Sequence, residues 1–404
     1  MKIKVGVIFG GKSVEHEISV ITASQAINAF NKEKYEIVPL YISKKGLMYT
    51  GDELLELKNF KDIESLLKKC VQISLVNDGN KVSLLKFPCS KFKSNVINSI
   101  DVAFPCMHGT NGEDGTIQGY LEFLGIPYVG CDILSSSIGM DKIMMRKILK
   151  EANIPSLDYY SFYSLDYIKD ESSIIESIEN KIDYPVIVKA GNLGSSVGIK
   201  KAKNNAQLKE AIEFAMQYSD RIMVERAIVN LKEINCSVLG DMIDAKASEC
   251  EEPFGSDEIL SYSDKYMSGS NGKNGKLSGN KNSGMASLDR KIPADITSDQ
   301  KEKIQSIAIK TFKTLGCNGV SRIDFMIDKD TDEIFVNEIN TIPGALSFYL
   351  WEATGISFEK ELDELIELAF KRERQKGSTT YSYDVNILAM SGSGKLGTKG
   401  SKKA

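Results

Sequence analysis

Short apolar runs alternate with segments of helical periodicity over residues 1–130. The runs that have the length of buried strands are 4–9, 35–41, 100–105 and 126–129. One helix is expected across 119–124, and another after the glycine pair at 10–11, with Ser13 as its N-cap and Glu15 in its first turn. Alternating strands and helices predict a doubly wound parallel sheet. The more polar stretch 45–98 is expected to elaborate that sheet and to contain an amphipathic helix near 61–70.

The pattern that follows predicts two further domains, 131–225 and 226–373. Expected helices are 141–152, 205–218, 298–315 and 359–373, and expected strands are 184–189, 196–200, 221–225 and 233–239. The fold class is therefore α/β (α+β) with three domains. Residues 267–287 are rich in glycine, serine, asparagine and lysine without an apolar period, which predicts a mobile loop. Residues 374–404 are expected to form a disordered tail.

Two apolar-rich runs, 322–328 and 333–340, flank a short acidic turn and predict an antiparallel hairpin. Side chains alternate between the faces of a strand, so Arg322 shares a face with Asp324, and Glu338 shares one with Asn340. If the two faces coincide, hard oxygen donors converge beside a guanidinium, which suits Mg²⁺ bound together with phosphates. The alternative is a solvated polar face on an amphipathic hairpin.

Composition narrows the class of protein. The 404 residues are enough for two to four domains, and 42% hydrophobic and 26% charged residues are ordinary values for a globular chain. A net charge of −4 without a basic stripe argues against nucleic acid as a partner. Neither a signal peptide nor a long apolar run indicates a membrane, and the seven scattered cysteines are typical of reduced thiols in the cytoplasm. Two histidines give little support to a zinc site or a Ser-His hydrolase.

Two segments in the middle of the chain suggest anion and nucleotide binding. Lys189 ends a strand and precedes the loop 191–198, whose glycines and serines would let backbone N–H groups approach a phosphate. A structural hairpin is the alternative for this loop. Glu225 and Glu233 bracket a domain junction, where they could accept hydrogen bonds from adenine and ribose or simply face solvent.

Taken together, the motifs resemble those of the ATP-grasp ligases, and within them the D-alanine–D-alanine ligases. The resemblance extends in order over nearly all of 1–373 and rests on Gly-Gly-x-Ser-x-Glu-x-Glu-Ile-Ser at 10–19, His-Gly-x-x-Gly-Glu-Asp-Gly at 108–115, Met-Asp-Lys at 140–142, Gly-Ser-Ser-Val-Gly at 194–198, Lys-Tyr at 265–266, Arg-Ile-Asp at 322–324 and Asn-Glu-Ile-Asn-Thr-Ile-Pro-Gly at 337–344. It implies an ATP-grasp architecture in which residues 1–130 form the substrate domain. It also implies ligation of two D-alanines through an acyl phosphate, for the synthesis of peptidoglycan precursors.

The resemblance also implies roles for individual residues. The ATP-binding residues would be Lys142, Lys189, Ser195, Ser196, Glu225 and Glu233, and two Mg²⁺ or Mn²⁺ ions would be held by Asp324, Glu338 and Asn340. The oxyanion would be stabilised by Arg322 and the N–H of Gly344. Glu15 would pair with the ammonium of the first D-alanine, with hydrogen bonds to Ser195 and Tyr266. His108 and Lys265 would line the substrate site, with 267–287 as a lid. The family further implies a cytoplasmic homodimer.

The second substrate is less well defined by the resemblance. Many relatives have a serine five residues after the glycine, where this chain has Tyr349. We expect the Tyr349 hydroxyl, or that of Ser347, to bind the carboxylate of the second D-alanine. The alternative is that Tyr349 packs against the core. D-serine or D-lactate could replace the second D-alanine, although Lys265-Tyr266 favours an amide product. A non-catalytic ATP-binding regulator is a further alternative, but it would be expected to have lost Arg322 or a metal ligand.

Overall fold

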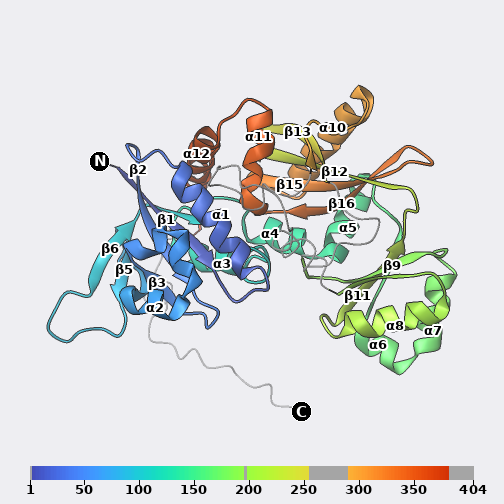
Figure 1. Cartoon of the computed structure of the whole chain (residues 1–404), viewed down its shortest axis with the longest axis horizontal. Helices are drawn as coiled ribbons and strands as arrows, with labels where there is room; N and C mark the ends of the chain where they lie inside the picture. The colour runs from blue at the N-terminus through green and yellow to red at the C-terminus, as the bar shows by residue number, and fades with distance from the viewer. Residues whose placement is uncertain (1, 195–197, 254–289, 382–404) are drawn as a thin grey trace, which may run out of the picture.

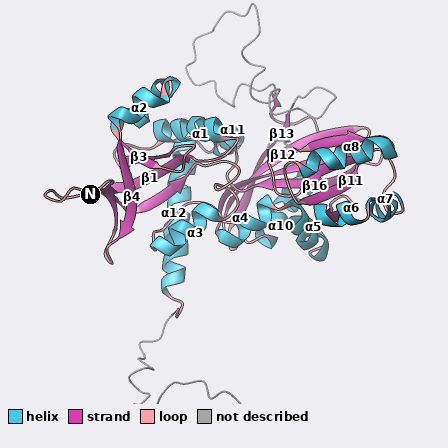
Figure 2. Cartoon of the chain, turned by 90° about the horizontal axis from the view of Figure 1, so that it is seen from below, coloured by secondary structure: helices cyan, strands magenta, loops and turns pink. Residues whose placement is uncertain are grey.

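The computed structural model describes residues 2–194, 198–253 and 290–381. Three sheets follow one another along the chain, and Figure 1 shows the first on the left and the second at the lower right, with the third between them. Figure 2, from below, shows helices on the faces of all three sheets. No helix among these residues is long and apolar enough to cross a membrane.

The first sheet has seven strands in the order β6-β5-β4-β3-β2-β1-β7. Its strands are β1 (Ile3–Gly10), β2 (Tyr35–Ile42), β3 (Met48–Thr50), β4 (Val71–Asn77), β5 (Val82–Lys86), β6 (Val96–Ile100) and β7 (Val102–Pro105), and its helices are α1 (His16–Ala29), α2 (Ile63–Lys69) and α3 (Thr116–Leu124). The predicted parallel pairing is confirmed for β1 with β2 and β7, whereas β3 to β6 pair antiparallel. The polar stretch 45–98 thus extends one edge of the sheet, and it includes α2 as expected.

The second sheet is antiparallel, in the order β10-β9-β11-β8. Its strands are β8 (Tyr159–Tyr163), β9 (Val186–Ala190), β10 (Ile199–Ala202) and β11 (Arg221–Arg226), and its helices are α6 (Ser164–Lys169), α7 (Glu171–Glu179) and α8 (Asn205–Met216). Apolar residues of α7 and α8 pack against alternate residues of the strands, such as Val186 and Val188. Lys189 follows Val188 on β9, so its side chain points to the opposite face of the strand, outside that core.

The third sheet has the order β14-β13-β12-β15-β16. Its strands are β12 (Leu231–Gly240), β13 (Ala245–Pro253), β14 (Arg290–Lys291), β15 (Gly319–Asp328) and β16 (Glu333–Asn340), and the helices near it are α4 (Ile133–Met140), α5 (Lys142–Glu151), α10 (Ser298–Thr314), α11 (Phe348–Ala353) and α12 (Phe358–Gly377). Even-numbered apolar residues of β12 and odd-numbered ones of β15 pack under α5 and α10. Because neighbours along a strand point to opposite faces, Asn235, Arg322 and Asp324 are directed to the other face. That polar face carries the candidate site.

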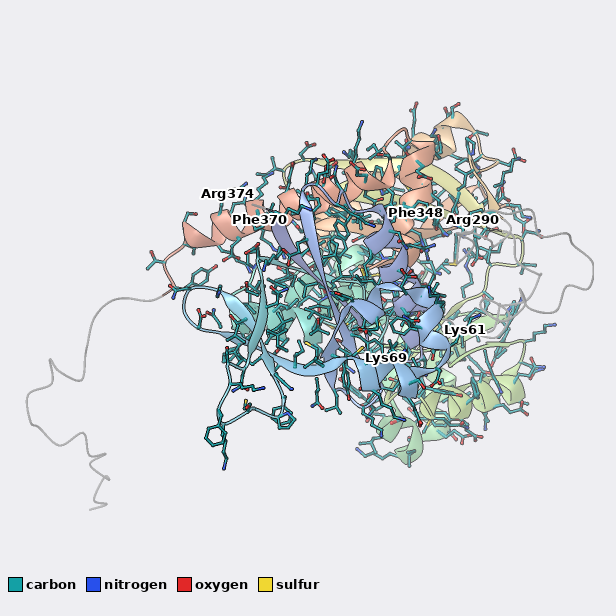
Figure 3. All side chains as sticks on the ribbon, turned by 60° about the vertical axis from the view of Figure 1, so that its left-hand side comes forward. Lys61, Lys69, Arg290, Phe348, Phe370 and Arg374 are labelled. Carbon is teal, nitrogen blue, oxygen red and sulfur yellow. The ribbon has the colours of Figure 1, made fainter. Side chains whose placement is uncertain are left out.

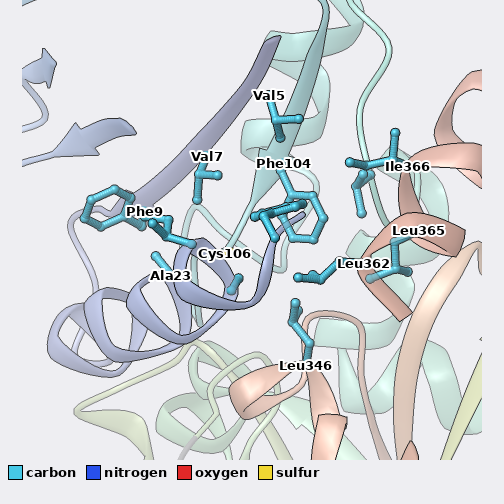
Figure 4. Packing of buried hydrophobic residues seen from close by; sticks show 14 of the residues in the cluster. Val5, Val7, Phe9, Ala23, Phe104, Cys106, Leu346, Leu362, Leu365 and Ile366 are labelled. Atoms are coloured by element: carbon cyan, nitrogen blue, oxygen red, sulfur yellow. The ribbon is translucent and has the colours of Figure 1, made fainter. Parts of the chain in front are cut away.

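The last helix joins the first sheet to the rest of the molecule. Leu362, Leu365 and Ile366 of α12 pack with Val5 and Phe104 of the first sheet, together with the turn at Leu346 (Figure 4). Arg372 of α12 also donates hydrogen bonds to the carbonyl oxygens of Tyr128 and Gly130. One core therefore contains residues from both ends of the described chain.

Three local predictions are wrong. Helix α1 begins at His16 with Glu15 in the N-cap position, so Ser13 precedes the helix; its hydroxyl accepts a hydrogen bond from the N–H of Glu15 (3.1 Å). Residues 126–129 form a single bridge, Ala103 to Tyr128, instead of a strand. Helix α12 continues to Gly377, beyond the expected start of the tail at 374. The domain bounds stay a prediction; within the expected second domain, apolar residues of α4 and α5 pack against the third sheet.

Candidate active site

The predicted hairpin is confirmed, and its polar faces coincide. Asp324 lies directly opposite Glu338, and Arg322 opposite Asn340. Arg322 donates two hydrogen bonds to Asp324, from Nε (2.7 Å) and Nη2 (2.8 Å), and Asn340 donates a third from Nδ2 (3.1 Å). Burial raises the pKa of Asp324, as do the charges of Glu338 and Glu251, while Arg322 opposes the shift. Burial would lower the pKa of Arg322, but the charge of Asp324 outweighs it and raises that pKa well above its ordinary value.

Two lysines from other elements reach this hairpin at a β-bulge in β16. Asp324 pairs with Glu338 but Phe325 pairs with Val336, so Asn337 is the additional residue on β16. In a bulge, two neighbouring side chains can point to the same side of the sheet. Asn337 accepts a hydrogen bond from Lys189 Nζ (3.1 Å), and Glu338 Oε2 lies 3.4 Å from Lys142 Nζ. Two cations from different elements thus converge on one point of β16.

The start of α5 determines the position of Lys142. The carboxylate of Asp141 accepts hydrogen bonds from the N–H groups of Ile143 (3.1 Å) and Met144 (2.9 Å), which caps the helix immediately before Lys142. Arg146 lies one turn further on the same face of the helix. This side chain is fully buried and donates to the carbonyl of Val336 (2.9 Å) and to Glu225 Oε2 (2.9 Å).

Glu225 forms a buried cluster with two of these cations. Its other oxygen pairs with Lys189 Nζ, and only 1% of the residue is exposed. Burial alone would raise the pKa of Glu225, but the charges of Lys189 and Arg146 lower it below its ordinary value, so the group is ionised. Glu233, the other residue expected at the nucleotide, is exposed at the start of β12.

The loop 108–115 approaches Glu15 closely. A methyl group on Gly109 would lie 2.3 Å from Glu15 Oε2, and Gly109 has a φ of +67°, so glycine is required there for two reasons. Glu113 accepts hydrogen bonds from the N–H groups of Gly109 (2.9 Å) and Ile342 (3.1 Å), which ties this loop to the end of β16. Burial and the charge of Glu15 raise the pKa of Glu113 to about 8. The two carboxylates therefore influence each other, and Glu113 takes up a proton more readily than an ordinary glutamate.

His108 lies behind this loop. Its Nε2 is 2.8 Å from the hydroxyl of Thr22 on α1, and that hydroxyl accepts a hydrogen bond from the N–H of Ala345 (3.2 Å). Burial and the charge of Arg322 lower the pKa of His108 to about 4, so the imidazole is neutral at neutral pH. His108 thus contacts the turn that follows β16 through Thr22.

That turn has an unusual backbone. Gly344 begins a short 3₁₀ turn, η5 (Gly344–Ser347), in which Ala345, Leu346 and Ser347 have φ values of 52°, 54° and 57°. Left-handed conformations cost L-residues roughly 1–2 kcal/mol each. Surrounding packing must therefore impose the conformation, as is common beside functional sites.

The two residues expected to bind the second substrate differ in their surroundings. The Ser347 hydroxyl is buried and has no hydrogen-bond partner within the described ranges. The Tyr349 hydroxyl donates to Glu251 Oε1 (3.1 Å), so its proton is not directed toward a substrate in this arrangement. Ser195, Ser196, Lys265, Tyr266 and the expected lid 267–287 lie outside the described residues.

Sequence reasoning missed several residues of this site, among them Thr22, Glu113, Arg146, Glu251 and Asn337. The four-residue spacing from Lys142 could have indicated Arg146. Glu113 is the glutamate of the His-Gly-x-x-Gly-Glu-Asp-Gly motif at 108–115, which could have indicated it.

The fold and these residues define an ATP-dependent ligase of the ATP-grasp class. Two family models, "D-ala D-ala ligase N-terminus" and "D-ala D-ala ligase C-terminus", match residues 4–131 and 148–367. A D-alanine–D-alanine ligase of Thermosipho melanesiensis is 40% identical over 96% of this chain and 98% of its own length, and one of Thermosipho africanus is 42% identical over the same shares. The chain belongs to the D-alanine–D-alanine ligase family.

Solved structures agree with this membership. The D-alanine–D-alanine ligase of Coxiella burnetii superposes with a TM-score of 0.76 at 30% identity, covering 93% of this chain and 96% of that one. The VanG D-Ala:D-Ser ligase of Enterococcus faecalis gives 0.75 at 32% identity, covering 91% and 100%. The names of these two enzymes differ in the second amino acid, D-alanine in one and D-serine in the other.

Proposed function

We propose that the chain joins two D-alanine molecules into D-alanyl-D-alanine with hydrolysis of ATP to ADP and phosphate, as a step in making peptidoglycan precursors. Membership of the family supports this activity and small-molecule substrates. The observation that carries the proposal within the molecule is the cross-strand arrangement of Arg322 and Asp324 opposite Asn340 and Glu338.

ATP would bind between the second and third sheets. Lys142 and Lys189 would neutralise its phosphates, because both are buried and directed at consecutive residues of the β16 bulge. Glu225 would orient Lys189 and accept a hydrogen bond from the adenine amine, with Glu233 at the ribose. Ser195 and Ser196 complete the proposed nucleotide site. This part of the site acts by positioning and charge neutralisation, since phosphoryl transfer needs little covalent chemistry from the protein.

Two Mg²⁺ or Mn²⁺ ions would be held by Asp324, Glu338 and Asn340. Carboxylate and amide oxygens suit these ions, and Asp324 lies directly opposite Glu338 on the hairpin. Three protein ligands would leave the remaining positions to nucleotide phosphates. When bound, such ions neutralise phosphate charge.

The amino acids would bind between Glu15 and Arg322. Glu15 would pair with the ammonium of the first D-alanine. The carboxylate of that D-alanine would attack the γ-phosphorus of ATP, giving an acyl phosphate and ADP. The amine of the second D-alanine would then attack the acyl carbon and release phosphate, while Arg322 and the Gly344 N–H stabilise the oxyanion. No protein nucleophile is required. Lys265, Tyr266 and His108 complete the substrate site, and 267–287 would exclude water as a lid.

The test is ADP release by the purified full chain with ATP, Mg²⁺ and a single amino acid. D-alanine alone should support turnover, and mass spectrometry should find the dipeptide. Paired reactions with D-alanine plus D-serine or D-lactate would identify the second substrate, and D-serine is included because of the similarity to VanG. No ADP release with any of these substrates would leave a non-catalytic ATP-binding regulator.

The proposal includes a homodimer in the cytoplasm, as the family implies. Sedimentation equilibrium of the full chain would give a mass near 89 kDa for a dimer against 44.6 kDa for the monomer, a factor of about two.

A further inference from the structure

Four polar side chains form a row across the third sheet. Glu251 of β13 lies opposite Asn235 of β12, Asn235 opposite Asp324 of β15, and Asp324 opposite Glu338 of β16. Residues directly opposite each other on neighbouring strands share a face. Strands lie ~4.8 Å apart, so Glu251 is roughly 10 Å from Asp324 along this row. The proposed metal ligands occupy one end of the row, and Glu251 occupies the other.

Glu251 determines the position of three neighbouring side chains. Its Oε1 accepts hydrogen bonds from Asn235 Nδ2 (2.9 Å) and Tyr349 Oη (3.1 Å), and its Oε2 accepts one from Arg290 Nη1 (2.9 Å). The guanidinium carbon of Arg290 lies 4.0 Å from the centre of the Tyr349 ring. Figure 3 labels Arg290 and Phe348, the residue preceding Tyr349, in the same part of the view. We call Glu251, Asn235, Arg290 and Tyr349 the Glu251 cluster.

Glu251 and Asn235 of the cluster are buried, Arg290 and Tyr349 are partly buried, and the cluster lies close to Arg322. Glu251 is 2% exposed, and its negative charge acts on both Arg322 and Tyr349. Burial together with that charge raises the pKa of Tyr349 to about 12, so its hydroxyl keeps the proton that it donates to Glu251. The cluster therefore forms a fixed wall beside Arg322, on the side away from Glu338.

This wall lies where the second amino acid would approach. Glu15 is assigned to the first amino acid, and Asp324 and Glu338 to the phosphate end. The turn η5 packs on β15, and Tyr349 lies close enough to Arg322 to act on its charge. We infer that Glu251 is a positioning residue for the second amino-acid subsite, because it fixes Tyr349 and Arg290 beside Arg322. The inference rests on the proposed ligase function.

The first test is Glu251→Gln in the full chain, with initial rates measured against D-alanine and ATP. The two subsites give two KM values for D-alanine. Glutamine presents an N–H₂ group where Glu251 accepts hydrogen bonds, so at least one contact of the cluster is lost. The second-site KM should rise roughly 10- to 150-fold, the range for losing a hydrogen bond to a charged group. The KM for ATP and the first-site KM should stay within about twofold, since those groups lie elsewhere.

The matched control is Glu252→Gln. Glu252 is the next residue of β13 and points to the opposite face, where it lies 3.3 Å from Lys232. All three KM values should remain within about twofold of those of the unaltered chain, because the site does not contact Glu252. A merely structural role for Glu251 would instead move kcat and all KM values together.

A double-mutant cycle tests whether Glu251 acts through Tyr349. If it does, Glu251→Gln and Tyr349→Phe combined should raise the second-site KM about as much as either change alone. If the two increases in the second-site KM multiply in the double variant, Glu251 does not act through Tyr349 and this part of the inference is overturned. If Glu251→Gln does not fold, Tyr349→Phe alone decides, and an unchanged second-site KM overturns the inference. Absence of ADP release by the unaltered chain would overturn the ligase proposal and the inference with it.

Discussion

Replacing Glu361 by glutamine should stabilise the protein increasingly as the pH rises. Glu361 lies on α12 with no exposed surface, and neither carboxyl oxygen has a hydrogen-bond partner in the described part of the chain. Burial, followed by the charges of Glu364 and Glu352, raises its pKa well above 4.5. The folded protein therefore keeps this carboxyl protonated at a pH where the unfolded chain ionises it.

The sign and size of the effect follow from proton linkage. Above pH 4.5 the unfolded state binds one proton fewer at this position, so the free energy of unfolding falls as the pH rises. The fall is ~1.4 kcal/mol for each pH unit until the folded carboxyl itself ionises. Glu361→Gln removes this slope but leaves a buried polar amide. Glu361→Met also removes the unsatisfied polar atoms, whose burial costs roughly 1–3 kcal/mol.

Urea unfolding at pH 5.5, 6.5 and 7.5 would measure the slope. Between the first and last of these, the unaltered chain should lose up to ~2.7 kcal/mol more than either variant. Glu364→Gln is the control, because Glu364 is on the same helix but partly exposed and 2.7 Å from Lys246. Such a pair contributes ~1 kcal/mol or less. Because burial is the largest cause of the raised Glu361 pKa, with the Glu364 charge second, this variant should keep most of the pH slope. Identical pH dependence for Glu361→Gln and the unaltered chain would refute the reasoning, as would a Met variant that is less stable at pH 7.5.

Three further changes have defined outcomes. Glu338→Gln should lower kcat for ADP release by at least ~10²-fold at saturating Mg²⁺, the scale of losing a preorganised electrostatic contact, and near-normal turnover would exclude Glu338 as a metal ligand. Ala345→Gly should leave the melting temperature unchanged or higher, because relief of ~1–2 kcal/mol at a left-handed residue exceeds the ordinary cost of glycine, and a drop of several degrees would count against backbone strain there. Glu113→Gln should gain stability relative to the unaltered chain by ~1.4 kcal/mol per pH unit between pH 4.5 and 8, because the raised pKa makes the folded chain bind the proton more tightly than the unfolded chain does. A constant difference across that window in urea titrations would contradict the raised pKa of Glu113.

The hairpin could be predicted from the sequence because the alternation of side chains along a strand is local. Arg322 and Asp324 had to share a face once 322–328 was recognised as a strand. The bulge could not be predicted, because the additional residue Asn337 depends on how two strands align. The contact of Glu113 with the Ile342 N–H was equally inaccessible, since it joins positions 229 residues apart.

The packing of helix α5 shows the same limit of what the sequence predicts. The apolar stripe of 141–152 correctly predicted a buried helix face. An amphipathic pattern indicates that a face is covered, but it carries no information about which element covers it. In the structure, the third sheet covers this face of helix α5, which places Lys142 and Arg146 within reach of β16 and Glu225. The family resemblance identified Lys142 but gave no reason to expect Arg146.

The core shared by α12 and the first sheet affects how the chain can fold during its synthesis. Val5, Val7 and Phe104 are made early, whereas Leu362, Leu365 and Ile366, which cover them, are made near the end. Domains generally fold as units while the ribosome proceeds, and apolar surface that stays uncovered invites association. The first sheet must therefore wait, with one face incompletely buried, until more than 360 residues have been translated. Fragments that end before α12 should accumulate in aggregates or in complex with chaperones, and supplying α12 as a separate peptide should increase their solubility.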